Sequence, residues 1–245
     1  MNNLLRSLVT YSYIIGFIPT KLIRLKQLQK KKATLSTADY DELVYETPRS
    51  WAKNILKKAG ATVELTGAEN LPEGAVLLIA NHEGNFDIPV LIATIQKPFG
   101  FLSKVEVKKI PFIADWMTEM NCVFIDRANR RSAMKSIEDS SISLQQGHSL
   151  LLFPEGTRSK GQGVQEFKAG FVRIASRANV PVVPIAIYGT SQLMEQQNNR
   201  VTPAHVKVHV LKPVQILEGE STDEFRERVQ QSITNARLIL EEASR

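Results

Sequence analysis

From about residue 61 onward, short apolar segments alternate with longer amphipathic ones, and this alternation limits the fold more than any other feature. The short segments have the length and composition of buried strands, and the longer ones have helical periodicity. Strands are expected at 75–80, 99–102, 122–125, 150–153, 182–188 and 206–210, and helices near 88–96, 108–119, 130–146, 168–178 and 222–243. The last strand alternates apolar and polar residues, so it is expected at an edge or half exposed. The sequence predicts an α/β fold, a mixed, largely parallel sheet flanked by helices, with its active site where strands end.

The composition fits a folded chain that works in a reducing compartment. The chain has 245 residues, of which 43% are hydrophobic and 23% charged, which allows a real core and argues against disorder. Cys122 is the only cysteine, so an internal disulfide and a cysteine-rich zinc site are excluded. An unpaired thiol is typical of the cytosol.

Common nucleotide-binding and hydrolase motifs are missing from the sequence. No G-x-G-x-x-G follows a predicted strand, and there is no G-x-S-x-G, so a dinucleotide site and a hydrolase nucleophile elbow are not expected. Residues 156–161 have the glycine spacing of a phosphate-binding loop, but Gln162 stands where that loop needs its lysine. The sequence therefore argues against an NTPase.

The positive charge is concentrated in residues 1–32, which we call the N-terminal segment. This segment holds seven Lys and Arg residues and no acidic residue, and since the whole chain has a net charge of +6, the other 213 residues sum to −1. A nucleic-acid binder usually carries its positive charge across the folded body. A nucleic-acid partner is therefore not expected.

The N-terminal segment also has an apolar face. Six residues recur at helical spacing: Leu4, Leu8, Tyr11, Ile15, Ile18 and Leu22. Arg6, Pro19 and Lys21 spoil the run that a membrane-spanning helix needs. We expect an amphipathic helix in the membrane interface, where each nearby Lys or Arg adds about 1 kcal/mol of attraction to anionic lipid. The alternative is a helix that packs on the body while its lysines face water.

A second helical stretch, roughly 37–59, is expected to break near Pro48 and to pack against the first helix. The two would form an N-terminal helical hairpin. We therefore divide the chain into a membrane-docking segment at 1–60 and an α/β domain at 61–245.

Polar residues cluster where the predicted strands end, and the first cluster holds a histidine and a carboxylate. His82 and Asp87 follow the strand at 75–80 and lie five residues apart, too far around a continuous helix to meet. They can meet if His82 lies in the loop and Asp87 begins the next helix, which Pro89 favours. Asp87 would then fix the tautomer of a histidine that acts as a base. The alternative is a loop histidine beside a helix cap.

Two further strand ends carry arginines that suit a phosphate group. Arg127 follows the strand at 122–125, and Arg158 follows the strand at 150–153 together with Glu155. Arginine forks match phosphate oxygens, and Lys104 after the strand at 99–102 could add charge. Each of these residues alone could equally be a surface ion pair or a solvated lysine. The other histidines, His148, His205 and His209, lack metal-type partners and are expected to be structural or exposed.

Taken together, the clusters resemble the four ordered motifs of the glycerolipid acyltransferase family, and within it the 1-acylglycerol-3-phosphate acyltransferases. Residues 82–87 are similar to its H-x4-D motif, 123–127 to the second motif, 153–159 to the third and 180–184 to the fourth. The second motif usually opens with glycine, whereas Asn121 stands here. Asparagine tolerates a left-handed backbone better than most residues, so we expect the turn to persist.

The resemblance implies transfer of a fatty acyl chain from a thioester to the free sn-2 hydroxyl of lysophosphatidate, which gives phosphatidate. His82 would be the general base and Asp87 would orient it. Glu155 would hold the glycerol hydroxyls or order its loop. The remaining implied site residues are Arg127, Arg158 and Lys104 for the acceptor phosphate, and Gly156 and Thr157 in the acceptor loop. The resemblance implies no metal and no cofactor, since the thioester is a co-substrate.

The resemblance also implies partners and a location. The donor would be acyl-CoA or an acyl carrier protein, and the sequence leaves the choice open. The chain would act at the cytoplasmic face of the cell membrane, as a peripheral or monotopic protein docked on anionic lipid through residues 1–32. Two alternatives remain: an acyltransferase for glycerol-3-phosphate or another lysophospholipid, and an inactive membrane-docked lipid-binding module.

Overall fold

The protein is built around a seven-stranded mixed sheet, seen in a computed structural model that describes residues 1–110, 112–126 and 128–244. The strand order is β1-β7-β6-β2-β5-β3-β4. Among the strands in the described residues, β6 and β7 form the only antiparallel pair, and the other neighbours are parallel. The strands are β1 (Thr62–Thr66), β2 (Leu77–Ala80), β3 (Gly100–Lys104), β4 (Val123–Ile125), β5 (Leu150–Leu152), β6 (Val182–Tyr188) and β7 (His205–Val210). The predicted mixed, largely parallel sheet is confirmed.

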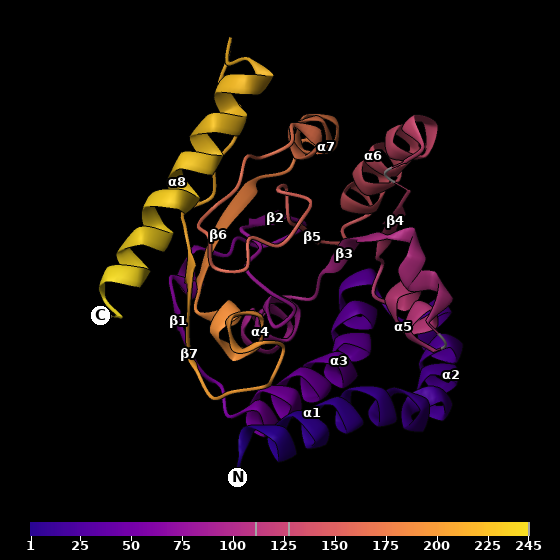
Figure 1. Cartoon of the computed structure of the whole chain (residues 1–245). Coiled ribbons are helices and arrows are strands. Elements are labelled where there is room, and N and C mark those ends of the chain that lie inside the picture. Colours follow the sequence, from indigo (N-terminus) through magenta and orange to yellow (C-terminus); the bar gives the residue numbers. More distant parts are fainter. Residues whose placement is uncertain (111, 127, 245) are drawn as a thin grey trace.

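Helices cover both faces of this sheet, which makes a three-layer molecule (Figure 1). The helices are α1 (Asn3–Phe17), α2 (Leu22–Lys31), α3 (Thr37–Ala59), α4 (Asp87–Thr94), α5 (Ile113–Glu119), α6 (Arg130–Gln145), α7 (Gly170–Ala178) and α8 (Thr222–Glu242). Short 3₁₀ turns are η1 (Ile18–Lys21), η2 (Lys32–Thr34), η3 (Ala68–Asn70), η4 (Val105–Lys109), η5 (Thr190–Leu193) and η6 (Glu195–Gln197).

The central strand β2 shows why two helix layers are needed. All four of its residues are buried, because alternate side chains face opposite layers. Leu78 and Ala80 pack in the core that contains α3 and α4, whereas Leu77 and Ile79 pack in the core that contains α6, α7 and α8. A strand that is apolar on both faces must be covered on both.

Three expectations about individual elements were wrong. The strand β1 was not predicted. Because β1 pairs along the outer side of β7, β7 is not an edge strand, although its alternating burial is the half-exposed pattern that was the other expectation. The helix expected at 108–119 is the 3₁₀ turn η4 followed by the shorter α5. The helix α3 does not break at Pro48, because its buried apolar residues hold it against the body on both sides of the proline. Asn121, in contrast, has φ 58°, which is the left-handed turn expected there.

The N-terminal helical hairpin is confirmed: α1 and α3 pack side by side (Figure 1). The apolar stripe of α1 faces away from the body, since Leu4, Leu8 and Ile15 are 64% to 74% exposed. The face toward the body carries the buried polar residues Ser7 and Thr10. The Ser7 hydroxyl accepts a hydrogen bond from the backbone N–H of Val201 at 2.8 Å. The helix is thus fixed to the protein through Ser7 and through Tyr13 and Ile14, which pack against the core, while the stripe of Leu4, Leu8 and Ile15 is exposed.

Within the described part of the chain, no helix is both long enough and apolar enough to cross a membrane.

Candidate active site

Three loops that follow central strands meet at one edge of the sheet. The strands β2, β5 and β6 are adjacent and parallel, so their carboxyl ends lie at the same edge. The loop after β2 carries the 81–87 cluster, the loop after β5 carries the 153–159 cluster, and β6 leads into η5. The 81–87 and 153–159 loops are joined through their backbones, since Ser159 N donates to His82 O at 2.8 Å.

His82 and Asp87 meet as the sequence predicted. The His82 Nδ1 atom lies 2.6 Å from Asp87 Oδ2. His82 lies in the loop and Asp87 begins α4, which brings the two side chains together. The imidazole also stacks on the Phe153 ring, with 4.0 Å between centroids. Since Asp87 occupies Nδ1, the other ring nitrogen is the one left for a substrate.

Asp87 is fully buried and is held from three directions. Besides His82, its Oδ2 accepts the backbone N–H of Gly84 at 3.0 Å, and its Oδ1 accepts the hydroxyl of Thr190 from η5. Thr190 was not among the predicted site residues, because it lies 103 residues from Asp87 and belongs to none of the clusters. Three donors on one carboxylate fix its orientation.

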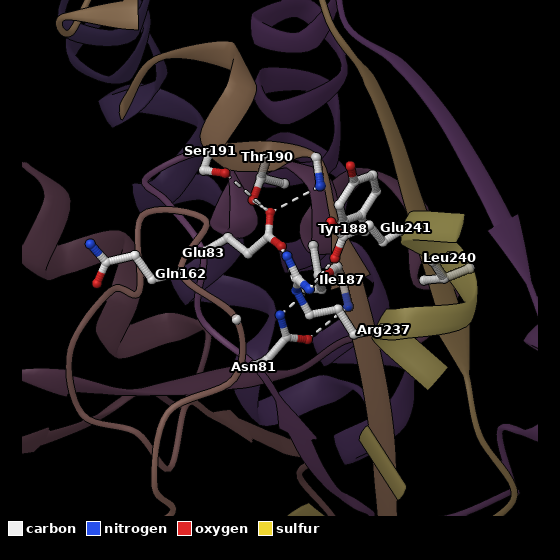
Figure 2. Close-up of polar contacts among 12 residues, drawn as sticks. Asn81, Glu83, Gln162, Ile187, Tyr188, Thr190, Ser191, Arg237, Leu240 and Glu241 are labelled. Atoms are coloured by element: carbon white, nitrogen blue, oxygen red, sulfur yellow. Dashed lines mark hydrogen bonds and ion pairs between the residues drawn. The ribbon is translucent and has the colours of Figure 1, made fainter. Parts of the chain in front are cut away.

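Asn81 fixes the start of the same loop. Its side-chain amide donates to Ile187 O at 2.9 Å and accepts from Ile187 N at 2.8 Å (Figure 2). These two side-chain bonds tie the residue that follows β2 to the backbone of β6. The histidine therefore follows directly on a segment anchored to the sheet.

Glu155 binds the backbone of the loops around the site and is not among the residues that line the cavity. Its Oε1 accepts the backbone N–H of His82 at 2.6 Å, and its Oε2 accepts the backbone N–H of Gln165 at 3.0 Å. The residue is only 4% exposed, and this burial raises the pKa of its carboxyl to about 7. Of the two roles expected for Glu155, these contacts favour the ordering of the loop.

Arg158 lines a cavity and lies next to an acidic residue that was not predicted from the sequence. Its guanidinium donates to Asn85 Oδ1 and lies 3.7 Å from Glu195 Oε1. The Glu195 side chain is 3% exposed and also accepts the backbone N–H of Asn85 at 2.7 Å. Burial raises the pKa of this carboxyl. Glu195 follows η5, outside the four clusters, so only the fold brings it here.

The cavity has a volume of about 610 Å³ and extends from His82 between α3, α4 and α5. Its inner wall is mostly apolar, and its lining includes Trp51, Ile88, Ile92, Phe101, Trp116 and Met120. Lys104, Arg158, Gly156 and Thr157 also line it. The cavity thus joins an apolar interior, an imidazole and cationic side chains.

The remaining site predictions have the following outcomes. Arg127 lies outside the described residues. His148 pairs with Asp41, with 2.6 Å between Nδ1 and Oδ2, and His205 and His209 contact Thr62 and Thr66 on β1. In the described residues, no three His, Cys, Asp or Glu side chains are grouped as a metal ion requires.

Comparison with known proteins identifies the family. The Acyltransferase family model matches residues 62–188. A probable 1-acyl-sn-glycerol-3-phosphate acyltransferase of Mycoplasma pneumoniae is 37% identical over 60% of this chain and 57% of its own length. A 1-acyl-sn-glycerol-3-phosphate acyltransferase of Chlamydomonas reinhardtii is 34% identical over 71% of this chain and 52% of its own length. The chain thus matches a little over half the length of these relatives.

A solved structure matches nearly the whole chain. The 1-acyl-sn-glycerophosphate (LPA) acyltransferase PlsC from Thermotoga maritima superimposes with a TM-score of 0.81 and 26% identity, covering 98% of both chains. The strand-end clusters lie within or beside the matched region 62–188, which includes His82, Asp87 and the loop around Arg158. The chain therefore belongs to the acyltransferase family.

Proposed function

We propose that this chain is a 1-acyl-sn-glycerol-3-phosphate acyltransferase, which moves a fatty acyl chain from a thioester to the sn-2 hydroxyl of lysophosphatidate and releases phosphatidate. One observation carries the proposal: a histidine–aspartate pair lies where an apolar cavity meets cationic side chains. A substrate with a long hydrocarbon chain and a phosphate matches both halves of this site. The names of the relatives and of the solved structure support the same activity.

The proposed chemistry needs one base and one orienting carboxylate. The free ring nitrogen of His82 takes the proton of the sn-2 hydroxyl while that oxygen bonds to the thioester carbonyl carbon. The carbon–sulfur bond then breaks, and the proton on the imidazolium passes to the leaving sulfur. Asp87 stabilises the imidazolium, because its Oδ2 already lies 2.6 Å from Nδ1. General-base assistance of this kind is typically worth about 10²–10⁴ in rate.

The same geometry suggests where the substrates bind. The apolar wall around Trp116 and Ile92 would take the acyl chain. Arg158 would turn from Asn85 and Glu195 to the acceptor phosphate, with Lys104 beside it on the cavity wall. Gly156 and Thr157 would form the acceptor loop. A phosphate role for Arg127 rests on the resemblance alone.

We also propose that the outer face of α1 docks on anionic membrane at the cytoplasmic face of the cell membrane. The exposed apolar residues of α1 belong to the N-terminal segment, which has seven positive charges and no acidic residue. An apolar face with flanking Lys and Arg is typical of helices that lie in the interface. Such docking would bring the cavity to the surface where its lipid acceptor resides.

The function is tested with purified protein in anionic vesicles. Lysophosphatidate is supplied with acyl-CoA or with acyl carrier protein thioester, and phosphatidate is measured. We expect turnover with at least one donor, and a kcat about 10²- to 10⁴-fold lower in the His82→Gln variant. Glycerol-3-phosphate and a lysophosphatidylcholine serve as competing acceptors. Faster turnover of either one would reassign the acceptor, and no transfer to any acceptor would contradict the proposal.

A further inference from the structure

A buried ion pair lies beside the histidine–aspartate pair and joins the loop of His82 to the C-terminal helix. The Nε atom of Arg237 on α8 lies 3.0 Å from Glu83 Oε1 (Figure 2). The two side chains are 6% and 1% exposed. Glu83 directly follows His82 in the chain, whereas Arg237 is 154 residues further along. Arg237 is not among the residues that line the cavity.

The Glu83 carboxylate connects the loop to the end of β6. Its Oε2 accepts the backbone N–H of Gly189 at 2.9 Å and lies 3.4 Å from the hydroxyl of Ser191 and 3.5 Å from that of Thr190. Thr190 is also the residue whose hydroxyl donates to Asp87. Ionised Glu83 therefore holds in place the segment that orients the catalytic carboxylate.

The backbone of Glu83 connects the same loop to the Arg158 loop. Its carbonyl oxygen accepts the backbone N–H of Lys160 at 3.0 Å, next to the bond from Ser159 to His82. A shift of Glu83 would consequently move His82 relative to Asp87 and relative to the cationic side chains that line the cavity.

Arg237 is itself held rigidly. Its guanidinium bonds Glu241 at 2.8 Å, one turn further along α8, and lies over the Tyr188 ring at 5.3 Å from the centroid. Burial and the nearby Asp87 both raise the pKa of Glu83, and the positive charge of Arg237 opposes them. The arginine thus favours the charged carboxylate, whose hydrogen bonds are stronger than those of a neutral acid.

Stability alone does not account for an ion pair at this place. The cost of desolvating two charges offsets most of their attraction, and apolar replacement of both partners is often neutral or stabilising. The location of the pair suggests a role in positioning instead. Glu83 is the residue after His82, and it lies near Thr190, whose hydroxyl donates to Asp87.

We propose that Arg237 is a positioning residue for acyl transfer: through Glu83 and the Gly189–Ser191 segment, it fixes His82 against Asp87. This inference rests on the proposed function for its rate measurements. It also has a test that needs no substrate, so the two can fail separately.

The rate test uses four variants. In Arg237→Met, kcat falls about 10- to 100-fold, the range expected for a small misplacement of a reacting group, while both KM values stay near wild type. We expect the kcat of Arg237→Lys to lie between those of wild type and Arg237→Met, because lysine keeps the positive charge but lacks the planar guanidinium. The double variant Glu83→Gln/Arg237→Met regains thermal stability, because no buried charge is left unpaired, but kcat stays low. Arg228→Met is the matched control, since Arg228 also lies on α8, pairs with a glutamate and covers an aromatic ring.

The substrate-free test follows the hydrogen bond itself. The Nδ1 proton of His82 gives a downfield NMR signal, identified by its loss in His82→Gln. We expect this signal to shift or broaden in Arg237→Met and to remain in Arg228→Met. If Arg237→Met does not fold, the lysine and double variants decide.

Recovery of kcat together with the melting temperature in the double variant would overturn the proposal, because the pair would then be only structural. An unchanged signal with unchanged kcat in folded Arg237→Met would do the same. A wild-type protein with no transferase activity would refute the proposed function, while the NMR signal would still test the role of Arg237.

Discussion

At the residue scale, two carboxylates of the site, Asp87 and Glu155, have hydrogen bonds to both of their oxygen atoms. Asp87 accepts hydrogen bonds from a ring, a backbone N–H and a hydroxyl, and Glu155 accepts two backbone N–H groups. A base fixed in this way needs no reorganisation when a substrate arrives. The proposed catalytic advantage of His82 depends on that orientation.

The chain contains a matched pair of histidines that tests this. His148 also bonds an aspartate at 2.6 Å, and both imidazole side chains are 17% exposed, but His148 does not line the cavity. We expect His82→Gln to lower kcat about 10²- to 10⁴-fold, the usual range for loss of a general base. His148→Gln should leave kcat near wild type. Single-turnover assays at equal protein concentration measure both, and equal losses would contradict a special role for His82.

Arg158 offers a second residue-level test. A hydrogen bond to a charged group is worth about 1.5–3 kcal/mol, and Arg158 is 40% exposed, so we expect the lower part of that range. Arg158→Ala should raise the KM for lysophosphatidate about tenfold and leave the donor KM unchanged. Arg177→Ala, at an exposed position on α7, is the control. A similar rise in both KM values would count against phosphate binding by Arg158.

The sequence pattern predicted the contact between His82 and Asp87, but not the residues from other elements that surround it. The H-x4-D spacing and Pro89 predicted how His82 and Asp87 meet, because the contact is local in sequence. Thr190, Glu195 and Arg237 reach the site from other elements more than 100 residues away, and no short-range pattern encodes such contacts.

At the element scale, α1 shows what helical periodicity can and cannot predict. The spacing of its apolar residues predicted the stripe correctly. Which face would contact the body depended on Ser7 and on its partner Val201, and that partner is known only from the fold. The strand β1 was missed for a related reason: it has only two apolar residues, and pairing with β7 stabilises it.

The exposed stripe of α1 predicts a loss of membrane binding when it is made polar. Burying a Leu or Ile side chain is worth about 1.5–3 kcal/mol, so each replacement should weaken vesicle affinity roughly tenfold or more. We expect Leu4→Ser/Leu8→Ser/Ile15→Ser to be released from anionic vesicles in flotation, with an unchanged melting temperature.

Met134→Ser/Ile142→Ser is the control for this experiment. It also removes two exposed apolar side chains, but from α6. Equal flotation of the triple variant and wild type would contradict docking through α1, and a loss in the α6 variant would relocate the docking face.

At the scale of the whole molecule, the parallel arrangement of β2, β5 and β6 gathers three distant loops and buries several carboxylates together. Burial raises the pKa of Glu155 to about 7, from an ordinary value of 4.5, and the nearby Asp87 and Glu83 act in the same direction. The folded chain therefore binds this proton more tightly than the unfolded chain. The stability that Glu155 contributes is complete below about pH 4.5 and is lost as the pH rises through about 7.

We expect the free energy of unfolding of wild type, relative to Glu155→Gln, to fall between about pH 4.5 and about pH 7 and then to level off. Urea titrations of both proteins across this interval measure the difference. A difference that stays constant or grows with pH would contradict the raised pKa.

The single cysteine has a practical consequence. The Cys122 thiol is partly buried beside β3, where Phe101 N donates to its sulfur at 3.2 Å and burial raises its pKa to about 12. A thiol that stays protonated reacts slowly with maleimides. A fluorophore can therefore be attached to one new cysteine, for example at Leu8→Cys, without first removing the native one. Its emission colour would then report how deeply that helix enters the lipid.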